Sequence, residues 1–148
     1  MKKVLCLLLC AMLLCAFALP ASATQQQTNS VRTVTVLDDG FVIIEELVVF
    51  ENTRASTKTA QRTATVTRSG VTIGVITIQA TFSYDGSTVS VTSKSVTQKT
   101  TYDGWSYSQQ SFTSSGGTVT LNAKLTKLLH AARTVTITMT CDKNGNIT

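Results

Sequence analysis

The feature that most constrains this chain is the stretch 71–91, VTIGVITIQATFSYDGSTVSV, which has the pattern of a long strand, a tight turn and a returning strand. Successive side chains of a strand point to opposite faces, so alternating polarity gives one apolar and one polar face. Before the turn this alternation is regular, and its apolar positions are Ile76, Ile78, Ala80, Phe82 and Tyr84. The pattern predicts a hairpin whose apolar face contributes to a core.

The turn of this hairpin is marked by Asp85 and Gly86, a pair that readily takes the positive φ angles of a two-residue loop. Such a loop predicts that Phe82 faces Val89, so that apolar side chains meet across the ladder. At Gly74 the apolar positions change from odd to even residue numbers. This change of parity predicts a bulge or bend there.

The first 23 residues have the pattern of a secretion signal. Lys2 and Lys3 form a basic leader, residues 4–19 are apolar, and the small-residue motif 21–23 resembles a cleavage site. A transmembrane anchor is the competing interpretation, but the apolar run is short for a span of about 20 residues. The sequence therefore predicts a signal peptide over 1–23 and a secreted or extracellular protein without a stable membrane anchor after cleavage. Association with the cell wall is left open.

Cleavage after Ala23 would leave 125 of the 148 residues, enough for one domain with a core. The loss of Lys2 and Lys3 lowers the formal charge from +5 to +3, and the remaining cations are scattered, which argues against a nucleic-acid partner. Cys141 is the one cysteine outside the signal segment, so a disulfide scaffold is excluded. We expect a buried free thiol, with an intermolecular disulfide as the alternative.

The rest of the chain carries further alternating stretches and frequent turn signals. Residues 24–30 are polar and predict a flexible N-terminus. Strands are predicted over 31–37, 41–50, 61–68, 93–101, 105–112, 119–125 and 135–141. Stretch 41–50 has a short helix as its second interpretation, and the spacing of leucines over 125–132 predicts at most a helical turn.

Seven to nine short strands with a turn signal about every ten residues are typical of an antiparallel sandwich or barrel. The predicted fold is all-β, an antiparallel β-sandwich of immunoglobulin-like or related type. A single domain is expected over residues 31–148.

Three turn and strand motifs, 81–87 (TFSYDGS), 103–106 (DGWS) and 134–141 (TVTITMTC), resemble those of small exported proteins from Gram-positive gut anaerobes that have no assigned function. The resemblance covers most of residues 54–148. It implies an exported β-sandwich and offers no catalytic residues. Similar proteins often carry a cysteine where this chain has Val91, which implies that Cys141 lies beside Val91 in the fold.

The chain offers little for acid–base or metal chemistry. His130 is the only histidine, and beside Leu129 and Ala131 it is interpreted as a loop residue. A catalytic triad, a zinc site or a histidine acid–base pair would need it together with partners that the sequence does not supply. The acidic residues gather at Asp38, Asp39, Glu45, Glu46 and Glu51 without the spacing of a calcium site. No enzyme activity, no cofactor and no metal site are therefore predicted.

Four aromatic residues are the speculative ligand-binding set, since aromatic faces stack on apolar ligand surfaces. They are Tyr84, Tyr102, Trp105 and Tyr107. Burial of Trp105 in the core is the favoured alternative for that residue.

The sequence favours a monomeric, non-catalytic binding or interaction protein of unknown ligand, with a cell-wall polymer or a glycan as the candidate partner. The competing interpretation is a structural or envelope subunit that assembles through sheet edges, with 93–101 as the exposed edge and Lys94 and Lys99 opposing such pairing. A secreted antibacterial protein or a hydrolase is a further alternative.

Overall fold

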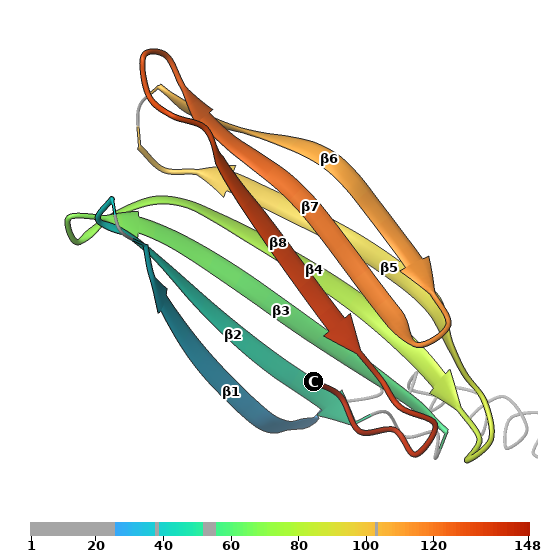
Figure 1. The fold of residues 1–148 in the computed structure, drawn as a ribbon. Helices are drawn as coiled ribbons and strands as arrows, with labels where there is room; N and C mark the ends of the chain where they lie inside the picture. The colour runs from blue at the N-terminus through green and yellow to red at the C-terminus, as the bar shows by residue number, and fades with distance from the viewer. Residues whose placement is uncertain (1–25, 38, 52–55, 103) are drawn as a thin grey trace, which may run out of the picture.

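The computed structural model describes residues 26–148 except 38, 52–55 and 103, and for residues 26–29 it describes the backbone alone. The predicted signal peptide over 1–23 lies outside the described residues. All regular structure in the described part is β, arranged as two antiparallel sheets (Figure 1). No helix among these residues is long and apolar enough to cross a membrane.

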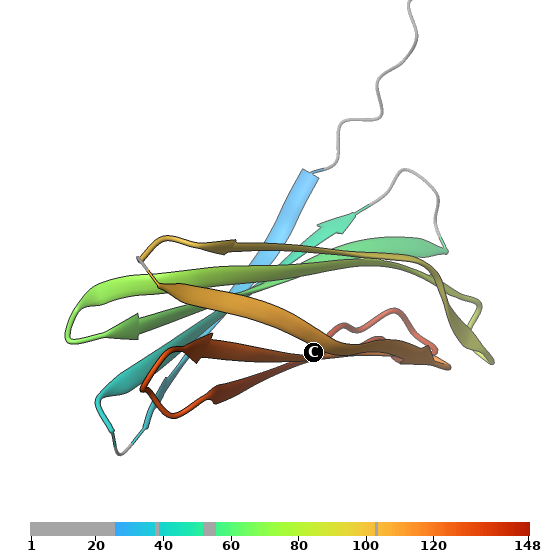
Figure 2. The same ribbon diagram turned by 90° about the horizontal axis from the view of Figure 1, so that it is seen from above.

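The larger sheet contains five strands in the order β1-β2-β3-β4-β5. Their bounds are β1 Gln26–Val36, β2 Phe41–Glu51, β3 Thr57–Arg68, β4 Val71–Tyr84 and β5 Val89–Thr100. The smaller sheet has the order β6-β7-β8, with bounds β6 Trp105–Ser115, β7 Thr118–Lys127 and β8 Arg133–Thr140. Figure 2 shows the two layers from above.

Each strand pairs with the next one in the sequence, and the chain changes sheet once, between β5 and β6. An immunoglobulin domain instead places strands that are distant in sequence beside one another. The predicted antiparallel sandwich is therefore confirmed, and it is the related type, a meander, that the chain adopts. The 41–50 stretch is a strand, as first predicted.

Two local predictions differ from the structure. β1 begins at Gln26, so a strand runs through most of the 24–30 segment that was expected to be flexible. The expected helical turn near residues 125–132 is wrong, because β7 continues to Lys127 and a tight turn follows. That turn is closed by the His130 N–H, which donates to the carbonyl of Lys127 at 3.1 Å.

The central hairpin has a longer loop than predicted. Tyr84 pairs with Val89 and Phe82 pairs with Val91, so the predicted pairing of Phe82 with Val89 is wrong. The cause is the side chain of Asp85, which accepts the N–H groups of Ser87 at 2.9 Å and Thr88 at 2.6 Å. These bonds stabilise a four-residue loop over 85–88 and move the register by two residues.

The predicted irregularity near Gly74 is confirmed. Gly74 pairs with Val66 while Thr72 pairs with Thr67, which leaves Ile73 as the extra residue of a bulge. Gly74 also meets the opposite layer, since a Cβ placed on it would lie 2.8 Å from Cε2 of Tyr107. Glycine at this position allows that ring to pack against the sheet.

The core lies between the sheets. The largest fully buried side chains are Phe82, Ile76, Ile78, Leu121, Leu125, Ile137, Met139, Val66, Val119, Val135 and Cys141. They come from β3, β4, β7 and β8 and the residue after β8, all at the alternating positions that the sequence marks. Cys141 is thus a buried free thiol, as expected.

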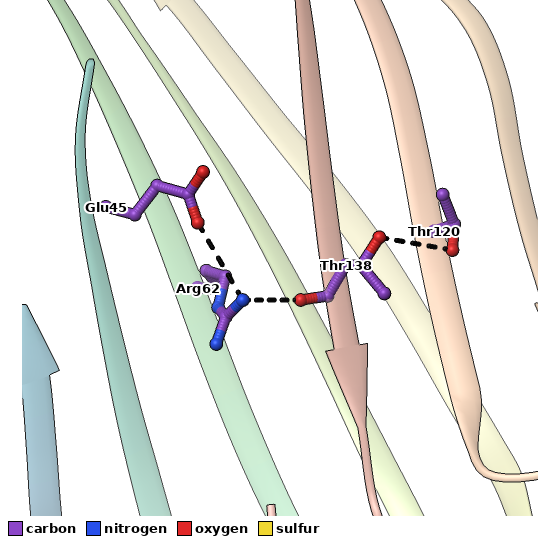
Figure 3. A network of polar contacts seen from close by, with 4 residues as sticks. All are labelled: Glu45, Arg62, Thr120 and Thr138. Atoms are coloured by element: carbon purple, nitrogen blue, oxygen red, sulfur yellow. Dashed lines mark hydrogen bonds and ion pairs between the residues drawn. The ribbon is translucent and has the colours of Figure 1, made fainter. Parts of the chain in front are cut away.

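A polar network joins the two layers where the smaller sheet ends (Figure 3). Nη1 of Arg62 on β3 donates to the carbonyl of Thr138 on β8 at 2.6 Å and lies 3.7 Å from Oε2 of Glu45 on β2. The hydroxyl of Thr138 lies 3.4 Å from that of Thr120 on β7. Arg62 therefore satisfies a carbonyl on the outer strand of the smaller sheet.

Candidate functional site

A cavity of about 380 Å³ opens at the end of the sandwich where the β3–β4 turn, the β5–β6 connection and the β7–β8 turn meet. We call it the end pocket. Its described lining residues are Arg68, Ser69, Val71, Ile73, Tyr102, Trp105, Lys127 and His130. Three separate turns contribute side chains, so the order of the strands in the two sheets determines the site.

The bulge in β4 positions the turn that carries Tyr102 and Trp105, the two aromatic residues of the end pocket. The carbonyl of Ile73 accepts the N–H of Thr101 at 2.9 Å and that of Tyr102 at 3.3 Å. The N–H of Trp105 in turn donates to the carbonyl of Tyr102 at 3.3 Å, closing a turn in which Gly104 has a φ of 78°. A positive φ of this size favours glycine, so Gly104 permits the turn that places Tyr102 and Trp105 at this end of the sandwich.

The two rings have different surroundings. Trp105 is 6% exposed and packs edge-on against Phe41, with ring centroids 5.7 Å apart. Its other neighbour is the ring of His130, at a centroid distance of 5.7 Å. Tyr102 is 49% exposed, and the ammonium of Lys127 lies over its ring at 5.3 Å. Trp105 therefore forms the floor of the end pocket, and Tyr102 presents a ring to solvent.

The charge around the end pocket is positive among the described side chains. Arg68 and Lys127 line it, and the guanidinium of Arg133 lies 5.2 Å from the centroid of the Phe41 ring, which packs against Trp105. The guanidinium of Arg68 lies 5.1 Å from the same ring. Asp39 forms an ion pair with Arg133. None of the described residues that line the cavity carries a carboxylate.

The structure brings together two of the four aromatic residues that the sequence proposed for ligand binding. Tyr102 and Trp105 share the end pocket. Tyr107 instead packs against Gly74 between the layers, and burial raises its pKa to about 12. Tyr84 packs against Gly145 of the C-terminal turn, with Lys58 5.9 Å from its ring centroid. A single platform of all four rings is therefore not formed. The burial of Trp105, which was the favoured alternative, is confirmed.

Sequence reasoning missed the basic members of the end pocket. Arg68 and Lys127 are the last residues of β3 and β7, and nothing in their own neighbourhoods marks them as partners. His130 is an exposed turn residue, as predicted, but its ring also lies beside Trp105. The sequence does show that Arg68, Lys127 and His130 each lie beside a predicted turn. The strand order is needed to know that these turns meet at one end of the fold.

Another hollow, of about 270 Å³, lies between β1, β2 and the C-terminal segment. Its lining includes Glu51 and Lys58, which have opposite charges, and Lys58 donates to the carbonyl of Gly145 at 3.0 Å. Among the described residues, no group of three or more His, Cys, Asp or Glu side chains is placed to hold a metal ion. The end pocket is thus the better candidate for a binding site, because its described lining combines aromatic faces with positively charged side chains.

Comparisons with known proteins give no relative from which a function can be taken: no family model, curated protein or solved structure matches this chain significantly. The geometry of the end pocket is therefore the feature of the molecule that points to a function.

Proposed function

We propose that this chain is an exported, non-catalytic binding protein whose end pocket takes an anionic cell-wall polymer or an anionic glycan. The observation that carries the proposal is the meeting of Tyr102 and Trp105 with Arg68 and Lys127 in one cavity. Export itself is inferred from residues 1–23, which precede the described part of the chain.

The chemistry of the end pocket supports a ligand that has both an apolar face and a negative group. An aromatic ring such as that of Tyr102 binds the apolar face of a sugar or polyol. Arg68 and Lys127 attract phosphate or carboxylate, and Arg68 can bind either group with two parallel hydrogen bonds. The volume lies within the range of roughly 300–1,000 Å³ that is typical of small-molecule sites.

A titration of the mature protein with a poly(glycerol phosphate) and with a neutral glucan tests the proposal. We expect binding of the anionic polymer that weakens as salt is raised, because exposed charges are screened, and little binding of the glucan. Tyr102→Ala and the double variant Arg68→Gln/Lys127→Gln should each weaken binding. The charge-matched control Lys124→Gln/Lys143→Gln removes two exposed lysines that do not line the end pocket and should bind normally.

Equal losses of affinity in the control and in the pocket variants would show that the interaction is non-specific charge attraction. No binding of either polymer would overturn the proposal.

A structural subunit remains the second candidate, and one observation favours it. The edge strand β1 exposes Val31, Val34 and Val36. The other edge of that sheet is β5, which includes all but the last residue of the predicted 93–101 edge, and there Lys94 donates to the carbonyl of Phe112 on β6 at 2.9 Å. Assembly would therefore use β1, and sedimentation equilibrium of the mature protein and of Val34→Lys separates an assembling subunit from a monomer.

A further inference from the structure

The tip of the β7–β8 turn carries two leucines that pack on no core. Leu128 is 85% exposed and Leu129 is 96% exposed. Leu129 has a φ of 62°, a left-handed conformation that glycine or asparagine adopts more easily. Single exposed apolar residues are ordinary. Leu128 and Leu129, however, are adjacent, lie on a strained turn and form an apolar projection whose exposed side chains are not stabilised by packing against the core.

This projection stands beside the end pocket and within a group of exposed apolar and basic side chains. Lys127 and His130 flank the two leucines and line the pocket. Val71 and Tyr102, on the other two turns, are 48% and 49% exposed. Figure 1 shows the β7–β8 turn at one end of the molecule, away from the body of the two sheets.

We infer that this end of the sandwich docks reversibly on an anionic lipid bilayer, with Leu128 and Leu129 inserted at the boundary between headgroups and acyl chains. This inference rests on the proposed function, because it identifies the anionic group taken by the end pocket as a lipid phosphate.

The side chains at this end of the sandwich are of the types that a membrane surface binds. Leu128 and Leu129 are exposed and meet the acyl boundary in the proposed complex, where apolar side chains are favoured. Lys127 and Arg68 line the adjoining pocket, and each basic side chain near an anionic surface adds to the attraction. Tyr102 has the amphipathic ring that is typical of the interfacial layer. An exposed apolar turn next to cationic side chains fits an anionic bilayer.

Co-sedimentation of the mature protein with vesicles tests the inference. We expect binding to vesicles that contain phosphatidylglycerol and little binding to pure phosphatidylcholine. The double variant Leu128→Ser/Leu129→Ser should bind the anionic vesicles at least about tenfold more weakly. The matched control Val34→Ser/Val36→Ser changes two exposed apolar side chains on β1 and should bind them as the wild type does.

The variant Leu129→Trp measures directly how deeply the β7–β8 turn enters the bilayer. Its fluorescence should shift to the blue on addition of anionic vesicles and be quenched by brominated acyl chains. Trp105 is buried, so the parent protein supplies the background. An emission that does not change while the protein sediments with vesicles would contradict insertion.

The same variants distinguish failure of this inference from failure of the proposed function. Leu128→Ser/Leu129→Ser should keep the wild-type affinity for free poly(glycerol phosphate), whereas Arg68→Gln/Lys127→Gln should lose both the polymer and the vesicles. Wild-type protein that binds the free polymer and ignores anionic vesicles overturns the membrane inference alone. Unchanged vesicle binding by the leucine variant overturns it as well.

Discussion

The ring of Tyr84 lies against Gly145 so closely that a Cβ on Gly145 would be 2.6 Å from Cε2 of that ring. The two residues are brought together by the C-terminal turn, in which the carboxylate of Asp142 accepts the N–H groups of Asn144 at 2.8 Å and Asn146 at 2.9 Å. The carbonyl of Lys143 in that turn accepts the N–H of Gly86 from the central hairpin loop at 2.9 Å. Tyr84 thus holds the end of the chain against the β4–β5 loop.

Gly145→Ala should destabilise the fold for two reasons, the φ of 82° and the clash with Tyr84. Gly40→Ala is the matched control, because Gly40 has a φ of 79° and open space around its Cβ position. We expect a loss of about 1–2 kcal/mol for the control, from conformation alone. A further loss of about 1–3 kcal/mol is expected at Gly145, from overpacking. Denaturant unfolding measures both, and equal losses would show that Tyr84 moves aside at no cost.

Phe82→Ala should be among the most damaging single changes. The side chain is fully buried between the sheets, and its removal leaves a cavity, so we expect a loss of about 3–5 kcal/mol. Phe112→Ala removes the same group from a partly buried position and should cost less. Denaturant titration of the two variants provides the comparison. A loss below about 1 kcal/mol for Phe82→Ala would mean that the faces of the central hairpin are reversed.

The register of that hairpin shows what sequence patterns supply. Alternation predicted that Phe82 is buried, because the face of a strand residue follows from its parity. It did not predict the partner of Phe82, because Asp85 selects a loop by accepting hydrogen bonds within that loop. Parity is a property of one strand, whereas register depends on side-chain geometry in the turn.

The end pocket shows where sequence reasoning stops. Tyr102 and Trp105 were recognised because aromatic residues beside a turn signal stand out in the sequence. Arg68 and Lys127 are far from them along the chain and reach the same cavity only because the β3–β4, β5–β6 and β7–β8 connections meet at one end of the two meandering sheets. Tyr84 and Tyr107 are also aromatic residues near turn signals, but the ring of Tyr84 packs against Gly145 and that of Tyr107 against Gly74.

Alkaline pH should destabilise the protein through Tyr107. Burial disfavours the phenolate and raises the pKa of Tyr107 from 10.0 to about 12. Between these values the unfolded chain loses the proton and the folded chain keeps it, so stability is complete below pH 10 and falls as pH rises toward 12. The full difference is roughly 2–3 kcal/mol, and partial exposure reduces the expected loss to about 1–2 kcal/mol.

Tyr107→Phe should remove the part of the stability loss at alkaline pH that comes from ionisation of this tyrosine. At pH 7 the variant should be as stable as the parent or slightly more so, since the Tyr107 hydroxyl is buried without a hydrogen-bond partner among the described residues. Unfolding midpoints of Tyr107→Phe and of the exposed control Tyr102→Phe, measured from pH 8 to pH 12, provide the comparison. Parallel profiles for Tyr107→Phe and the parent would disprove the assignment.

The mature chain should begin at Thr24, because the small-residue motif ends at Ala23. N-terminal sequencing or intact mass of protein from a culture supernatant checks this. Ala23→Glu is a useful variant, because a large charged residue at the cleavage position should block processing and leave the precursor with the cells. A secreted product that retains Met1 would refute the predicted signal peptide.

Cys141 should be unreactive in the folded protein. Burial raises the pKa of its thiol, the Asp142 carboxylate raises it further, and the thiolate is the reactive form. Its N–H donates to the carbonyl of Gly117 at 2.8 Å, and a Cβ on Gly117 would lie 2.8 Å from Cγ1 of Val89 on β5. Thiol titration in buffer and in denaturant should find the group only after unfolding. Rapid labelling of the native protein would contradict this.

The proximity of Cys141 to Val91 stays a prediction, and a disulfide tests it. Val91→Cys should oxidise with Cys141 if the two Cβ atoms lie about 3.5–4.5 Å apart. Closing a loop of about 50 residues should then stabilise the fold by about 4 kcal/mol, less any strain. Val89→Cys is the control, since Val89 lies on the same strand and beside Gly117. We expect Val91→Cys to lose both free thiols, to melt higher and to keep the mass of a monomer. Two titratable thiols in oxidised Val91→Cys, with none in Val89→Cys, would place Val89 next to Cys141 instead.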